Sequence, residues 1–150
     1  MKGVMLLAAA LLAPLGAWSA AGHVSSADEQ AIRRTLQIYF DGHATGKREV
    51  MAGAFHPDAR LSWIRDGAYA TRTLEEFLSG FSGKPAADES QRRRRIVSVD
   101  VAGKAAVAKL ELDYPDATFT DYMTLLEVAD GDWKIVHKSF YVAPKHTAKI

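Results

Sequence analysis

The chain has 150 residues, of which 48% are hydrophobic and 25% charged, as is ordinary for a globular protein with one core. Its formal net charge of +1 gives no electrostatic basis for binding nucleic acid or an anionic membrane surface. The absence of cysteine excludes disulfides, thiolate catalysis and cysteine-ligated zinc.

Residues 1–21 have the pattern of a secretory signal peptide. Lys2 precedes an apolar run over residues 4–12, and small residues lead up to an expected cleavage after Ala21. The run is shorter than the roughly 20 residues of a membrane span. We therefore expect an exported protein, periplasmic or extracellular, with no stable membrane anchor and with a single domain over residues 22–150.

Three helices are predicted in the first half of this domain. Ser26 and Glu29 form an N-terminal capping pattern for the first. Its inward face is expected to carry apolar and aromatic residues at helical spacing, namely Ile32, Leu36, Phe40 and His43, with Tyr39 beside them. A short second helix is predicted over residues 47–55, and a third follows the capping pattern of Thr73 and Glu76.

The strands are predicted mainly from alternation and turn signals. Residues 58–65 and 68–71 flank Asp-Gly, residues 91–101 and 104–114 flank Ala-Gly, and a long hairpin over residues 117–141 turns at a second Asp-Gly. Helices followed by an antiparallel meander predict an α+β fold, with the helices on one face of a curved sheet.

A two-residue turn in the long hairpin would pair Thr124 with His137. One face of the hairpin is then apolar near the turn and polar or aromatic further away, with Tyr122, His137 and Tyr141 among its members. We expect this graded face to line a pocket. The opposite, outer face would carry Asp121, Met123, Leu125 and Glu127 against Phe140, Lys138, Val136 and Lys134.

Four arginines in a row open the strand at residues 91–101. Strand alternation places Arg92 and Arg94 on the outer face and turns Arg93 and Arg95 toward the helices. An arginine there would either favour an anionic or carbonyl-bearing ligand or pair with an acidic side chain such as Asp41.

Residues 39–47, 55–67 and 119–140, with the order of the elements, resemble the nuclear transport factor 2-like superfamily and its "Putative lumazine-binding" group. The resemblance implies a cone-shaped, cystatin-like fold of three helices closing a curved antiparallel sheet around a pocket. It also implies a homodimer formed through the outer sheet face.

The superfamily includes ketosteroid isomerase, dehydratases and cyclases as well as binding and assembly modules. Compared with ketosteroid isomerase, Tyr39 falls at the oxyanion-stabilising tyrosine, but Ser62 or Trp63 stands where that enzyme has its catalytic aspartate. Dehydratases and cyclases use a His/Asp pair, for which His137 and Asp58 are the available residues.

Three functions follow. The first is an exported protein that uses no metal or cofactor and binds a small planar ligand that can carry negative charge. Its ligand-binding residues would be Tyr39, Trp63, Arg95, Tyr122, Thr124, His137 and Tyr141. The second is a lyase or isomerase that uses His137 with Tyr39 or Asp58. The third is an assembly module that dimerises through its sheet.

Overall fold

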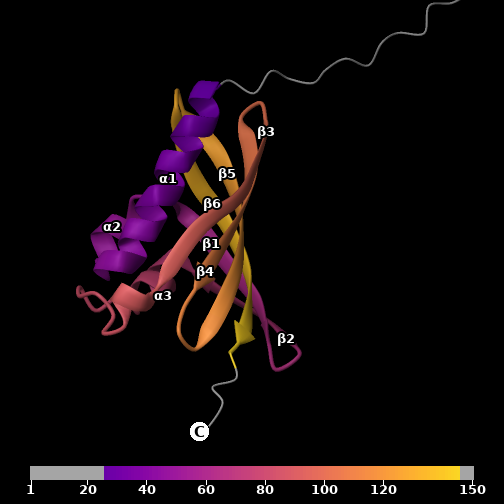
Figure 1. Ribbon diagram of the computed structural model, residues 1–150. Coiled ribbons are helices and arrows are strands. Elements are labelled where there is room, and N and C mark those ends of the chain that lie inside the picture. The colour runs from indigo at the N-terminus through magenta and orange to yellow at the C-terminus, as the bar shows by residue number, and fades with distance from the viewer. Residues whose placement is uncertain (1–25, 146–150) are drawn as a thin grey trace, which may run out of the picture.

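A computed structural model describes residues 26–145, so the predicted signal peptide lies outside the described residues. Its elements are α1 (Ser26–Thr45), α2 (Arg48–Ala52), β1 (Phe55–Arg65), β2 (Ala68–Thr73), α3 (Leu74–Leu78), a 3-10 turn (Glu89–Gln91), β3 (Arg93–Ala102), β4 (Ala105–Asp113), β5 (Ala117–Ala129) and β6 (Asp132–Pro144). The helices lie on one side of a strongly twisted sheet (Figure 1).

The six strands are ordered β2-β1-β6-β5-β4-β3. This confirms the α+β fold, with one difference: β1 and β6 are parallel, so the sheet is mixed. The chain leaves α2 at the end of the sheet where β6 begins, and Ile135 N–H donates to the Ala54 carbonyl there at 3.0 Å. β1 must therefore run in the same direction as β6.

The second helix is shorter than predicted because its last residues begin a strand instead. α2 ends at Ala52, and Phe55 already pairs with Ile135 of β6. Pro57 does not break this strand, because it lies in a register shift of the ladder between Phe55 and Arg60. A residue without an N–H is tolerated where no ladder bond is required of it.

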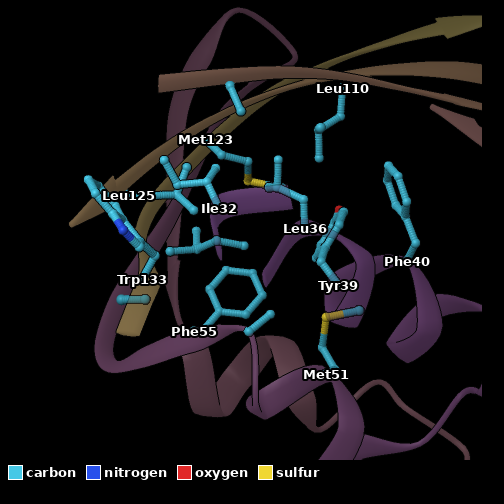
Figure 2. Close-up of a cluster of buried hydrophobic side chains, with 14 of the residues drawn as sticks. Ile32, Leu36, Tyr39, Phe40, Met51, Phe55, Leu110, Met123, Leu125 and Trp133 are labelled. Atoms are coloured by element: carbon cyan, nitrogen blue, oxygen red, sulfur yellow. The ribbon is translucent and has the colours of Figure 1, made fainter. Parts of the chain in front are cut away.

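The hydrophobic core lies between α1 and the concave, helix-facing side of the sheet, which we call the inner face. Ile32, Leu36 and Tyr39 have no exposed surface, as their helical spacing predicted. Figure 2 shows these side chains directed at Met123 and other apolar residues of the sheet. Burial of each large apolar side chain contributes about 1.5–3 kcal/mol.

Two bulges reverse the predicted faces of the long hairpin. Val128 of β5 and Val136 of β6 have no partner across the ladder, so the alternation shifts by one residue at each. Ile135 faces the core as predicted, but the next residue to do so is Lys138 rather than His137. The predicted pairing of residues 120–124 with 137–141 is nevertheless correct, because the two shifts cancel.

The predicted inner and outer sets are consequently exchanged. Tyr122 and Tyr141 are 51% and 67% exposed on the outer face, where Thr124 and His137 also lie. The residues expected outside are buried against the helices, namely Asp121, Met123, Leu125 and Lys138.

A third bulge, at Val97, has the same effect on the arginine run. Arg94 turns inward and its buried side chain pairs with Glu89 at 2.6 Å. Arg95 lies on the outer face and pairs with Glu111 at 2.9 Å. The predicted orientations of these two arginines are therefore wrong.

Candidate functional site

A cavity of about 460 Å³ opens between the inner face of the sheet and helices α1 and α3. Most of its wall is aromatic or aliphatic, with rings from Trp63, Phe77, Tyr114, Phe119 and Phe140. Its polar lining residues are His43, Arg65, Asp66, Arg72 and Lys138. Its size and its apolar lining with a few polar groups are typical of small-molecule sites.

A buried polar network lies beneath this cavity. Lys138 Nζ donates to the Tyr39 hydroxyl at 2.6 Å, and the hydroxyl donates to Asp121 Oδ2, also at 2.6 Å. Lys138 and Asp121 form an ion pair at 2.9 Å, with side chains 6% and 0% exposed. The network connects α1, β5 and β6 at the point where they meet.

The network keeps the Tyr39 hydroxyl protonated and leaves one N–H donor of Lys138 free. Burial raises the pKa of Tyr39 well above its usual value, and the nearby Asp121 carboxylate raises it further. The hydroxyl therefore stays protonated and donates. An ammonium carries three N–H donors. Asp121 and Tyr39 engage two of those on Lys138, so the third is available to a ligand in the cavity that Lys138 lines.

His43 is a second polar group of the cavity wall, held on α1 among the rings of Tyr39, Phe77 and Phe81 at 4.7–6.4 Å between centroids. Burial lowers its pKa well below the usual value, and the positive charge of Lys138 lowers it further. The imidazole is therefore neutral at pH 7. Its Nε2 is buried without a hydrogen-bond partner among the described residues.

The structure separates the predicted ligand-binding residues. Trp63 lines the cavity, and Tyr39 lies at the network beneath it. The other five, Arg95, Tyr122, Thr124, His137 and Tyr141, do not line the cavity, because the bulges direct them outward. Tyr122 and Thr124 instead border a separate hollow of about 350 Å³ that residues of β3, β4 and β6 also line.

The alternative catalytic set is not brought together. His137 Nε2 lies 3.1 Å from Ser62 Oγ on the outer face, whereas Tyr39 is bonded to Asp121 in the core. The Asp58 side chain is 93% exposed at the start of β1. A proton could not pass directly among groups on opposite faces of a sheet, so the predicted combination is wrong in its geometry.

Sequence reasoning missed His43, Asp121 and Lys138 as cavity and network residues. A signal was present on β5, because Asp121 alternates with Met123 and Leu125, an apolar pair typical of a core face. A charged residue in register with such a pair indicates a buried, paired charge.

Two further observations concern the described residues as a whole. Within residues 26–145, no group of three or more His, Asp or Glu side chains is placed to hold a metal ion. No helix in the same range is long and apolar enough to cross a bilayer.

Comparisons with solved structures agree with this architecture. An NTF2-like protein of unknown function from Methylobacillus flagellatus KT is 29% identical, with a TM-score of 0.70 over 81% of this chain and 96% of that one. One from Shewanella baltica OS155 is 23% identical, with a TM-score of 0.70 over 79% and 95%. The CaMKII hub of S. rosetta is 12% identical, with a TM-score of 0.56 over 76% and 95%.

No curated protein sequence matches the chain. The family model described as "Putative lumazine-binding" matches residues 27–141, which cover every helix and strand of the described domain apart from the first residue of α1 and the last three of β6. With its NTF2-like fold, the chain therefore belongs to the "Putative lumazine-binding" family.

Proposed function

We propose that this protein is exported and binds a small planar molecule in the cavity on the inner face of the sheet. The observation that carries the proposal is Lys138, whose ammonium group keeps one N–H donor free in the wall of an aromatic cavity. Phe140 and Phe77 flank this ammonium at 4.9 and 5.9 Å from their ring centroids. A flat heterocycle could therefore pack on aromatic surface while one of its carbonyl oxygens accepts from Lys138.

Trp63 and Phe140 together form aromatic surface in the cavity wall. The Trp63 ring stacks on Phe140 with centroids 5.4 Å apart and planes inclined by 24°. The pair holds the indole in a fixed orientation, which lowers the entropy lost on binding. The family description adds lumazine, a pteridine with two carbonyl groups, as a candidate of fitting chemistry.

Calorimetric titration with lumazine, riboflavin and a steroid tests the proposal, with thermal shift as a second readout. We expect one of the planar heterocycles to bind. Trp63→Leu should weaken that binding by about ten-fold, the scale of a lost stacking contact. Tyr122→Leu is the matched control, because it removes an aromatic ring from the outer face. Equal losses in both variants, or no binding by any compound, would contradict the proposal.

Catalysis is a second candidate function, favoured by the buried Tyr39–Asp121–Lys138 network at the cavity wall. Lys138 could stabilise negative charge that develops on a ligand oxygen. Exchange of carbon-bound protons of a bound carbonyl compound, followed by NMR in D₂O, tests this function. The exchange should disappear in Lys138→Met, and a rate equal to that without protein would contradict it.

We also propose that two copies associate through the outer sheet face. This face exposes Val107, Tyr122 and Leu126 at 53%, 51% and 41%, which is unusual for large apolar side chains unless another surface covers them. Light scattering after gel filtration should give the mass of a dimer, and Val107→Glu should give a monomer. A wild-type monomer at every concentration would refute this association.

Export follows from the pattern of residues 1–21. N-terminal sequencing of the protein recovered from the periplasm or medium should begin near Gly22. Cytosolic protein that retains Met1 would contradict export.

A further inference from the structure

The cavity opens beside a pair of arginines on the inner face of the sheet edge. Trp63 and Arg65 are two residues apart on β1 and so share a face. Arg72 of β2 pairs with Leu61, the next inward position of β1. Strand alternation therefore places one aromatic ring and two guanidinium groups side by side at the opening.

Both guanidinium groups pack on the same indole. Arg72 Cζ lies 4.6 Å and Arg65 Cζ lies 5.3 Å from the centroid of the Trp63 ring. A guanidinium within about 6 Å of an indole centroid is attracted to the ring, and this contact does not use its N–H groups as hydrogen-bond donors to oxygen.

The N–H groups of Arg65 and Arg72 have no acidic partner in the described part of the chain. Arg33, Arg48, Arg92, Arg94 and Arg95 each form an ion pair, whereas Arg65 and Arg72 form neither an ion pair nor a side-chain hydrogen bond. The nearby Glu76 carboxylate accepts from Thr73 N–H at 2.7 Å in the capping box of α3. This hydrogen bond is the largest cause of the lowered pKa of Glu76, and the charge of Arg72 contributes to it without a hydrogen bond between them. The N–H donors of the two arginines are therefore available to a ligand.

We propose that this arginine pair binds a carboxylate group carried by the planar ligand, which makes aromatic carboxylates the ligand class of the cavity. This inference rests on the proposed function of the same cavity. Asp66 lines the opening beside the two guanidinium groups and Glu76 borders them, but neither carboxylate accepts a hydrogen bond from Arg65 or Arg72 in the described part of the chain. The guanidinium N–H groups can therefore form bidentate hydrogen bonds with the two oxygens of a ligand carboxylate. The planar part of the ligand extends inward toward Lys138.

Calorimetric titration with lumazine and with lumazine-6-carboxylate tests the inference, because the two probes differ only in the carboxylate. Hydrogen bonds to a half-exposed charge should make the carboxylate probe bind about ten-fold more tightly at low salt. The preference should shrink as ionic strength rises. Arg72→Gln should reduce this preference to near equality, and because the preference is the ratio of the two affinities in the same variant, any effect of the substitution on the Trp63 ring that both probes share cancels.

Arg60→Gln is the matched control. Arg60 is exposed on the same strand and also forms no ion pair among the described residues, but it does not line the cavity. Its replacement removes the same charge and should leave the preference intact. If both probes bind equally to wild type, or if Arg60→Gln abolishes the preference as Arg72→Gln does, the inference is overturned while the proposed function stands. If neither probe binds, the proposed function fails together with the inference.

Discussion

Replacement of Asp121 by asparagine should destabilise the domain more than any change of similar size at its surface. Asp121 has no exposed surface and is the negative partner of Lys138 at 2.9 Å. The substitution keeps the shape of the side chain but leaves a buried ammonium without a counter-charge, which costs about 3–5 kcal/mol. A domain of this size is stable by roughly 5–15 kcal/mol, so the loss is a large fraction of the total.

Urea unfolding followed by circular dichroism measures this loss. With a slope of about 2 kcal/mol per molar urea, the midpoint should fall by roughly 2 M. Asp100→Asn is the control, because Asp100 is exposed and forms no ion pair in the described part of the chain; its midpoint should change by less than about 0.3 M.

A triple variant tests whether the loss of stability comes from the unpaired charge of Lys138. Tyr39→Phe, Asp121→Leu and Lys138→Met together remove all three members of the network, so none of its polar groups is left buried without its partner. Apolar replacement of a buried ion pair is often neutral or stabilising, so the triple variant should be at least about 2 kcal/mol more stable than Asp121→Asn. An Asp121→Asn loss below about 1 kcal/mol, or a triple variant less stable than the single one, would refute the reasoning.

Three further predictions concern the scaffold. The unfolded chain protonates His43 near pH 6.5, whereas the folded chain keeps the imidazole neutral, so the stability of the domain falls as the pH drops below that value. The urea midpoint of His43→Phe should therefore depend less on pH between 5 and 7.5 than that of wild type. Gly46→Ala places a methyl group against the Lys84 carbonyl at a position where φ is 65°. Gly103 has a similar φ of 58° but open surroundings, so Gly46→Ala should lower the unfolding temperature far more than Gly103→Ala. Thr73→Ala removes the acceptor of the α3 capping box and should cost about 1 kcal/mol in urea unfolding, and an unchanged midpoint would contradict its capping role.

The fold was largely predictable because its signals are local. Helical spacing of apolar residues placed the inner face of α1 correctly, and the Thr73 capping box placed α3. The pairing of Thr124 with His137 was also correct. The family resemblance rests on the same residues and is confirmed by the family model.

The site was less predictable because its residues depend on bulges. One unpaired residue at Val136 exchanges His137 for Lys138 on the inner face, and one at Val97 exchanges Arg95 for Arg94. Val97 and Val136 give no local sign of a bulge, because the β-branched side chain of valine is also common in regular strands. The predicted pocket residues of β3, β5 and β6 therefore lie on the opposite face of the sheet, whereas Trp63 lines the cavity.

The central claim is that ligand binds on the inner face of the sheet, at Trp63 and Lys138. A crystal structure of the protein grown with lumazine tests it most directly. We predict density for the pteridine ring in the cavity beside Trp63, with a carbonyl oxygen within hydrogen-bond distance of Lys138 Nζ. Density for the ring on the outer face against Tyr122 and His137, with the cavity free of ligand, would contradict the account.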